Sequence, residues 1–79
     1  MKKSEFVHKI SEYCEFPDQN LTLNTSLKSI EGYDSFAIMS LIAFSDENFS
    51  VKLAAQQIIK LTDFNSLIEL LGEDKFENG

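Results

Sequence analysis

The sequence has one cysteine, one histidine and no tryptophan, and these shortages exclude several kinds of function. Because Cys14 has no second cysteine to pair with, no disulfide can form within the chain. His8 and Cys14 are the only nitrogen or sulfur ligands, and on one helix they point in different directions. Neither a structural zinc site nor a cysteine–histidine catalytic pair is therefore expected. Cys14 is expected instead to lie in the core as a small apolar side chain.

Basic residues, glycines and long apolar runs are also scarce. Seven basic against thirteen acidic residues give a net charge of −6, which argues against nucleic acid and anionic membranes as partners. The three glycines form no phosphate-binding loop, and residues 46–48 lack the glycine and glutamate that would complete a calcium loop. The longest uncharged stretch, residues 35–45, is too short for a membrane span, and the N-terminus lacks an apolar signal core. We therefore expect a cytoplasmic protein.

What the chain does contain is enough apolar residue for one core. Hydrophobic residues make up 43% of its 79 residues, a share typical of a globular domain rather than a disordered segment. A chain this short has room for a single domain. We expect that domain to span residues 1–79, with a core from about 4 to 72 and a polar, frayed tail over 73–79.

The first predicted helix starts near Ser4 and ends before Pro17. Ser4 is a suitable N-cap, and Glu5 suits the positive end of the helix dipole. Apolar positions fall within one arc of this helix and are expected to face the core: Phe6, Val7, Ile10, Tyr13 and Cys14. Pro17 follows Phe16 and cannot continue the helix.

Residues 17–34 lack helical periodicity and are expected to form a long loop. Turn and cap residues are frequent in it: Asp18, Asn20, Asn24, Ser26 and Gly32. Four apolar residues are expected to fix the loop to the core: Leu21, Leu23, Leu27 and Ile30. A short helical turn is expected over residues 26–30. A loop of this length is uncommon in a compact domain and is usually functional.

The second helix is predicted over residues 35–48. One group of side chains is assigned to the core: Ile38, Leu41, Ile42, Ser45 and Phe49. Phe36, Met39 and Ala43 fall on another face, close to Glu47. Phenylalanine and methionine rarely face solvent together without a reason. They either pack beneath the long loop or belong to a surface that contacts a partner.

Two further helices complete the expected fold. A short one is predicted over residues 54–59, and Thr62 and Asp63 precede a fourth helix that ends at Gly72. The fourth helix has one apolar face: Phe64, Leu67, Ile68 and Leu71. No strand pattern is present. The sequence thus predicts an all-α fold, a small four-helix bundle of three longer helices and one short helix, with a long loop between the first and second helices.

The segment Gly32-Tyr33-Asp34-Ser35-Phe36 lies where the long loop meets the second helix. In the ordinary structural interpretation, Asp34 or Ser35 caps the helix and Gly32 supplies a turn. A serine in the first helical turn is also a good place for a phosphodiester, because free backbone N–H groups and the helix dipole favour negative charge there. Since Asp34 would repel such a phosphate, its role is better explained by capping, by orienting the attached group, or by recruiting a metal-bound modifying enzyme.

With this motif in this layout, the sequence resembles the acyl carrier protein family over nearly its whole length, from about Glu5 to Gly72. The resemblance rests on Asp34-Ser35-Phe36, on Gly32 before them, and on the order of a first helix, a long loop, the serine and a long helix. It implies that a phosphopantetheinyl transferase esterifies Ser35 with 4′-phosphopantetheine from coenzyme A. It also implies a non-catalytic, monomeric carrier whose partners are acyl- or aminoacyl-loading ligases and acyltransferase or synthase enzymes.

The second helix departs from the common fatty-acid carriers, which are strongly acidic soon after the serine. Here the matching positions are Ala37 and Ser40, and acidic residues return only at Asp46 and Glu47. Acids near a helix C-terminus oppose its dipole at a cost of a few tenths of a kcal/mol. They are kept either for solubility or for docking partners together with Phe36, Met39 and Ala43. The uncharged beginning of the second helix predicts a carrier dedicated to a specialised pathway, such as secondary metabolism, surface-sugar modification or aminoacyl activation.

Two alternative functions and one expectation about cargo remain. The chain is alternatively a stand-alone peptidyl or aminoacyl carrier, although such carriers often have glycine and histidine before the serine where this one has Tyr33 and Asp34. It is otherwise an unmodified helical adaptor that binds a partner through Phe36 and Met39.

Seven phenylalanines leave little adaptable space between the helices, which favours a short or polar cargo held outside them.

Overall fold

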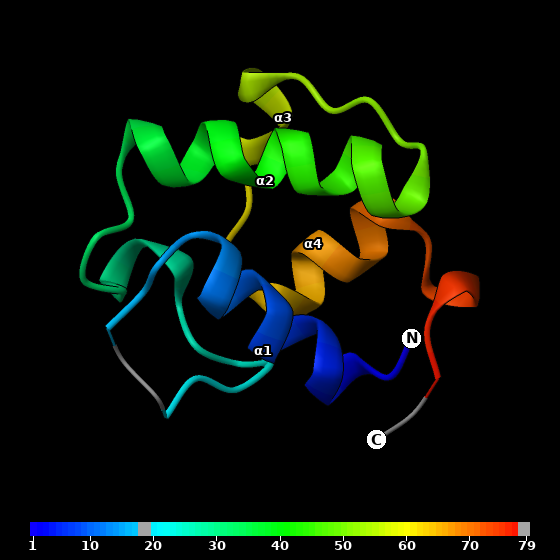
Figure 1. The fold of residues 1–79 in the computed structure, drawn as a ribbon, viewed down its shortest axis with the longest axis horizontal. Helices are drawn as coiled ribbons and strands as arrows, with labels where there is room; N and C mark the ends of the chain where they lie inside the picture. The colour runs from blue at the N-terminus through cyan, green and yellow to red at the C-terminus, as the bar shows by residue number, and fades with distance from the viewer. Residues whose placement is uncertain (18–19, 78–79) are drawn as a thin grey trace.

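The computed structural model describes residues 1–17 and 20–77, and over this part the protein has a small all-α fold (Figure 1). Its four α-helices are α1 (Lys3–Tyr13), α2 (Ser35–Phe49), α3 (Ala55–Ile59) and α4 (Phe64–Leu71). Two short 3-10 turns cover Leu27–Ser29 and Glu73–Lys75. Within the described residues, extended pairing is limited to two isolated bridges, Lys2 with Glu77 and Ser26 with Asp63. Asp18, expected as a turn residue, lies outside the described residues.

Helix α1 starts earlier than the sequence indicated, and the expected cap at Ser4 is wrong. Lys2 is the N-cap residue and makes no side-chain capping bond, while Ser4 lies inside the first turn. The Lys2 carbonyl already accepts the first helical hydrogen bond from the Phe6 amide at 3.0 Å. The start is set by a distant segment, because the Lys3 amide donates to the Glu77 carbonyl at 3.1 Å. A contact between the two ends of the chain thus replaces a local cap.

The buried face of α1 is largely as predicted. Phe6, Val7, Ile10 and the C-cap residue Cys14 are all buried. Tyr13 is the exception, because 38% of it is exposed and its ring contacts that of Phe44 from the margin of the core. The helix ends before Pro17, as expected, through a residue with positive φ at Glu15.

Helix α2 begins at Ser35 as predicted, but its buried face differs from the predicted one. The buried side chains are Ala37, Ser40, Leu41, Phe44 and Ser45. Of the predicted face only Leu41 and Ser45 are buried, whereas Ile38, Ile42 and Phe49 lie half-buried against the edge of the core. At ~100° per residue, the true face is rotated by about 90° from the predicted one. The Ser45 hydroxyl is satisfied inside the core because it donates to the Leu41 carbonyl at 2.8 Å.

Helices α3 and α4 match the prediction closely. Ala54 precedes α3, whose Ile58 is fully buried, and Asp63 is the N-cap of α4. One carboxylate oxygen of Asp63 accepts from the Ser66 amide at 2.9 Å, and the Ser66 hydroxyl returns a bond to the Asp63 carbonyl at 2.6 Å. Gly72 ends α4 with a φ of 116°, a backbone conformation that favours glycine.

The long loop is attached to the start of α4 rather than lying free. The Leu27 amide donates to the Thr62 carbonyl at 2.9 Å, and the Asn65 amide donates to the Leu23 carbonyl at 3.2 Å. The 3-10 turn Leu27–Ser29 confirms the expected helical turn. Leu27 and Ile30 are buried, and Leu21 and Leu23 pack partly buried against the core. All four predicted anchors therefore contact the core.

The expected frayed tail is wrong for the described residues 73–77. Phe76 packs against the core, with its ring centroid 4.9 Å from that of Phe6 and 5.2 Å from that of Phe49. The Glu77 amide donates to the Met1 carbonyl at 2.9 Å, and the Lys3 ammonium contacts the Glu73 carboxylate at 3.1 Å. An aromatic anchor therefore holds this segment in place, whereas residues 78–79 lie outside the described part.

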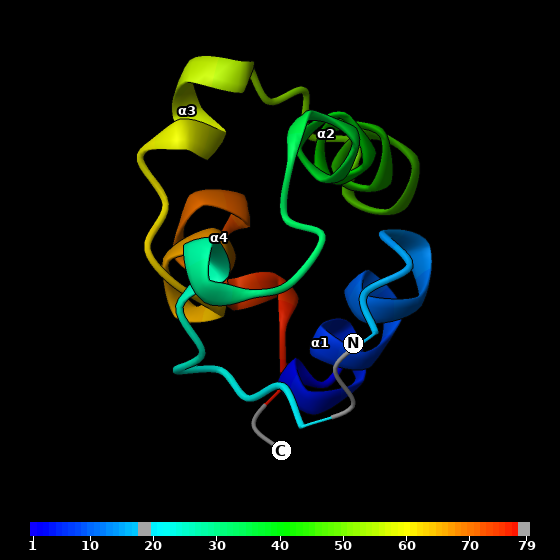
Figure 2. The same cartoon turned by 90° about the vertical axis from the view of Figure 1, so that its left-hand side faces the viewer.

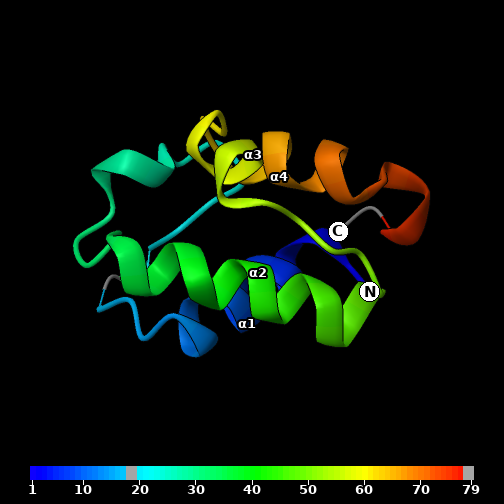
Figure 3. The same ribbon diagram turned by 90° about the horizontal axis from the view of Figure 1, so that it is seen from above.

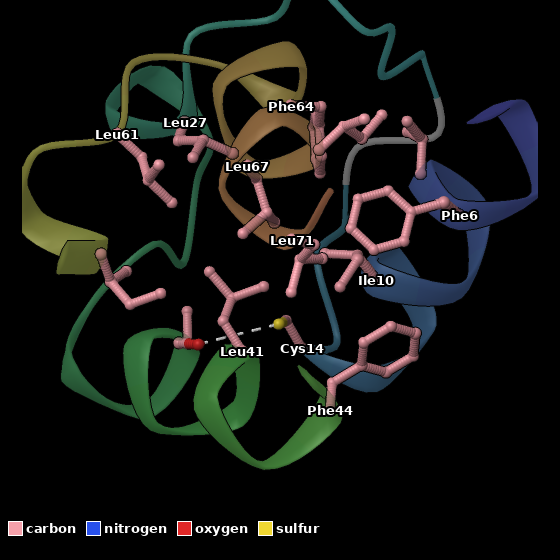
Figure 4. Packing of buried hydrophobic residues seen from close by; sticks show 14 of the residues in the cluster. Phe6, Ile10, Cys14, Leu27, Leu41, Phe44, Leu61, Phe64, Leu67 and Leu71 are labelled. Carbon is pink, nitrogen blue, oxygen red and sulfur yellow. Dashed lines mark hydrogen bonds between the residues drawn. The ribbon is translucent and has the colours of Figure 1, made fainter. Parts of the chain in front are cut away.

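The helices surround one apolar core. Helices α1 and α2 run close to each other, α3 lies beside the first half of α2, and α4 lies across the core from α2 (Figures 1, 2 and 3). Figure 4 shows side chains from α1, α2, α4 and the long loop pointing toward one another in this space. Six of the largest are essentially inaccessible to solvent: Phe6, Leu27, Leu41, Phe64, Leu67 and Ile68.

Candidate functional site

Ser35 is the first residue of α2, and its side chain is exposed. A turn brings the chain to this position, because the Tyr33 amide donates to the Ile30 carbonyl at 3.1 Å. Gly32, the third residue of that turn, has a φ of 88°, which is why glycine is favoured there. In the described part of the chain, no hydrogen-bonding partner engages the Ser35 hydroxyl. The hydroxyl is therefore accessible to solvent.

Asp34 is the N-cap of α2, which confirms the capping interpretation. One of its carboxylate oxygens accepts from the Phe36 amide at 3.1 Å and from the Ala37 amide at 3.3 Å. The expectation of free first-turn amides beside Ser35 is therefore wrong for these two positions. A group attached to Ser35 gains little from the helix N-terminus, because the Asp34 carboxylate already occupies it. Such a group is expected to project into solvent.

Two residues on either side of Ser35, Tyr33 and Ala37, fix the first turn of α2 to the core. Ala37 is completely buried, and its carbonyl lies 3.9 Å from the Cys14 sulfur, the contact drawn in Figure 4. The half-buried Tyr33 ring lies 6.4 Å from that of Phe16. Burial raises the pKa of the Tyr33 hydroxyl, with a smaller contribution from Cys14. Ser35 is thus an exposed serine on a fixed turn.

Cys14 is a core residue, as the sequence predicts. Its side chain is only 3% exposed, and burial raises the pKa of the thiol to about 12. His8 is on the opposite, exposed side of α1, where it contacts Glu12 at 3.1 Å. The predicted separation of the two side chains is confirmed. In residues 1–17 and 20–77, no three His, Cys, Asp or Glu side chains gather closely enough to hold a metal ion.

The outward face of α2 carries the residues predicted to contact partners. Phe36 is 54% and Met39 69% exposed, so the alternative in which they pack beneath the long loop is wrong. Ala43 is half-buried, and Asp46 and Glu47 are exposed at the far end of the helix.

A weak hydrogen bond links this face to α1. The Tyr13 hydroxyl donates to a Glu47 carboxylate oxygen at 3.5 Å. The pKa of the Tyr13 hydroxyl is raised by removal of water and then by the negative charge of Glu47. Glu47 therefore faces the margin between α1 and α2 as well as solvent.

Ile59 is an exposed residue that the sequence reasoning missed. It lies at the end of α3 and is 56% exposed, whereas the preceding Ile58 is fully buried. Adjacent residues in a helix point about 100° apart, so two consecutive isoleucines in a short helix rarely face the core together. The two consecutive isoleucines in the sequence therefore indicated that one of them would be exposed.

A scan against protein-family models, a search of curated proteins and a search of solved structures each returned no match. Across the described residues, none of the helices combines the length and the apolar character needed to cross a membrane.

Proposed function

We propose that this protein is an acyl carrier protein, a non-catalytic four-helix bundle that carries cargo on a 4′-phosphopantetheine arm attached to Ser35. The observation that supports the proposal most directly is the exposed Ser35 hydroxyl at the first residue of α2, directly after the Asp34 cap. When bound, the arm supplies a thiol that holds an acyl group as a thioester.

The residues around Ser35 have separable tasks in this proposal. The Ser35 oxygen forms a bond to phosphorus while the pyrophosphate bond of coenzyme A breaks, the nucleotide leaves, and the hydroxyl proton passes to the modifying enzyme. Asp34 holds the first turn rigid through the Phe36 and Ala37 amides. Its charge also directs the attached phosphate away from the helix and toward solvent. Tethering raises the effective concentration of cargo at each enzyme that docks.

The proposed docking residues lie along the outward face of α2: Phe36, Met39, Ala43, Asp46 and Glu47. The exposure of Phe36 and Met39 supports an apolar contact with a partner. We assign partners of three kinds: the phosphopantetheinyl transferase, a loading ligase for acyl or aminoacyl groups, and the acyltransferases or synthases of a specialised cytoplasmic pathway. Transfer rates measured for Glu47→Lys and Met39→Ala test this assignment, which fails if neither changes with any partner enzyme.

Intact-mass measurement tests the modification itself. The protein is incubated with coenzyme A and a phosphopantetheinyl transferase, and wild type is expected to gain one phosphopantetheinyl group. Ser35→Ala is expected to gain none, and Ser29→Ala, which removes another exposed serine before α2, is expected to be modified like wild type. Modification of Ser35→Ala, or none of wild type under conditions that modify a known carrier, contradicts the proposal.

The exposed Phe36 and Met39 also favour a second function, an unmodified helical adaptor that binds a partner through α2. The adaptor requires no chemistry at Ser35. The same mass measurement separates the two functions, because only the carrier changes in mass.

A further inference from the structure

Residues 73–77 form a strap that follows α4 and lies against the start of α1, where Figure 1 shows it in red beside the first residues of the chain. The strap pairs with residues 1–3 through its backbone. The Glu77 amide donates to the Met1 carbonyl at 2.9 Å, and the Lys3 amide donates to the Glu77 carbonyl at 3.1 Å. Pairing of this kind is one of the ways in which proteins bind an extended peptide.

The rings of Phe6 and Phe49 form a slot for the ring of Phe76. The Phe76 centroid lies 4.9 Å from that of Phe6 and 5.2 Å from that of Phe49. The planes of the Phe6 and Phe76 rings meet at 70°, which is a favourable edge-to-face contact. Phe6 is fully buried, and Phe76 provides part of its cover. Departure of the strap would therefore open the slot to another aromatic side chain.

Charge adds a third feature to the position that the strap occupies. The Lys3 ammonium contacts the Glu73 carboxylate at 3.1 Å, and the Lys3 side chain is only 19% exposed. Lys2 precedes it, whereas the strap contains three acids: Glu73, Asp74 and Glu77. Backbone pairing, an aromatic slot and a shielded cation together fit an extended segment that has an aromatic residue among acids.

Gly72 connects the strap to α4 and is the natural hinge. Its φ of 116° lies in a region that L side chains rarely adopt, and a Cβ there would lie 2.9 Å from a carboxylate oxygen of Asp74. Alanine at this position would strain the closed strap but not an open one, in which φ is free to become negative. Segments held by few contacts also open more readily than the whole domain unfolds.

We propose that the strap is an internal ligand of a peptide-binding site at the start of α1. When the strap opens about Gly72, the site binds an extended segment of a partner protein in which an aromatic residue stands between acids. Such a site goes beyond the proposed carrier function and does not depend on modification of Ser35. The strap of a second copy is a poorer occupant, because two chains with a net charge of −6 repel each other and each strap already fills its own site.

Binding of a fluorescent peptide that copies residues 72–77 tests the proposal by anisotropy. The apparent Kd for Phe76→Ala and for Gly72→Ala is expected to be about tenfold lower than for wild type, because each change weakens the strap that competes with the peptide. Lys75→Ala alters an exposed residue of the strap and is the matched control, with a Kd like that of wild type. A peptide with alanine in place of its phenylalanine should bind none of these proteins.

Two further measurements locate the peptide. Its binding should shift the NMR amide resonances of Lys3 and Phe49, and Lys3→Gln added to Gly72→Ala should raise the Kd about threefold, as for loss of a partly exposed ion pair. Circular dichroism first establishes that each variant is folded.

Three results would overturn the proposal while leaving modification of Ser35 unaffected. One is no binding to any variant at about 1 mM peptide, and another is equal affinity for wild type and the Phe76→Ala and Gly72→Ala variants. The third is a dimer of Gly72→Ala in sedimentation, since the strap of a second copy would then fill the site.

Discussion

Asp34 makes two hydrogen bonds that are common in proteins, yet they decide what the neighbouring serine can gain from its helix. Because its carboxylate accepts from the Phe36 and Ala37 amides, it stabilises the first turn of α2. Asp34→Ala is expected to lower the free energy of unfolding by about 1 kcal/mol. Asp34→Asn should lower the free energy of unfolding much less, because the asparagine amide oxygen caps a helix nearly as well as a carboxylate. Urea denaturation of both variants measures the difference, and equal losses would contradict a capping role.

Cys14 gives a dependence of stability on pH whose sign is fixed by its burial. Burial raises the pKa of the folded-state thiol from its ordinary value of 9.0 to about 12. Between these two values the unfolded chain loses the thiol proton while the folded chain keeps it. The free energy of unfolding should therefore fall as the pH rises above 9, by at most about 1.4 kcal/mol per pH unit from this group. Below pH 9 the thiol contributes no such dependence.

Tyr13 and Tyr33 also have raised pKa values and act in the same direction at high pH, so the Cys14 contribution needs a control. Cys14→Ala retains both tyrosines and removes the thiol. Denaturant unfolding at pH 8 and pH 10.5 should show a smaller loss of stability for Cys14→Ala than for wild type. Parallel losses in the two proteins would show that the thiol is not buried as described.

Local signals in the sequence predicted where helices begin and end. Asp34 and Asp63 cap α2 and α4 as expected, because a cap depends on residues three or four positions away. Ser4 fails as a cap although its local sequence is suitable, because a bond between Lys3 and Glu77 sets the start of α1. The position of Ser35 was therefore predictable from its neighbours, whereas contacts between distant segments were not.

The orientation of α2 shows where periodicity stops being informative. This helix is apolar around most of its circumference, with Ile38, Leu41, Ile42 and Phe44 spread over a wide arc. A pattern of this kind gives no single preferred face. Side chains on other helices determine which face of α2 is buried. Phe44 of α2, for example, packs against Phe6 of α1 with ring centroids 5.9 Å apart. The sequence separated Phe36 and Met39 from the predicted core face but left open whether they pack beneath the long loop, and the structure exposes both.

The segment after α4 is held by backbone hydrogen bonds to residues 1–3, by the Lys3–Glu73 contact and by one aromatic side chain, whose contribution can be measured separately. Phe76 contacts the rings of Phe6 and Phe49 and is half-buried. Phe76→Ala is expected to lower the free energy of unfolding by about 2 kcal/mol, less than for a fully buried phenylalanine. Lys75→Ala removes an exposed neighbour and should cost little. Chemical denaturation compares the two, and equal stabilities would show that the tail does not dock.

For the proposed carrier, the molecule as a whole limits which cargo can lie between the helices. Side chains from α1, α2 and α4 meet at the centre with essentially no exposure, among them Leu41, Leu67 and Ile68. Phenylalanine rings pack around them, and close-packed interiors do not admit extra methylene groups without strain of about 1–3 kcal/mol. A long acyl chain would have to displace these contacts, whereas a short or polar cargo can stay on the arm in solvent. For the proposed carrier, the packed core therefore favours a short or polar cargo.

Loading the modified protein with an acetyl or a long-chain acyl group tests this limit by NMR. Methyl resonances of Leu41, Leu67 and Ile68 are expected to keep their chemical shifts with either cargo, because neither enters the space that these side chains fill. The thermal midpoint should likewise not rise with the long chain, since a ligand that binds the folded core would raise it. Resonances near Ser35 are expected to move in both cases and show that loading occurred. Shifts of the three core methyl groups with the long chain alone would show that the core opens to it, and the carrier would then be suited to hydrophobic cargo.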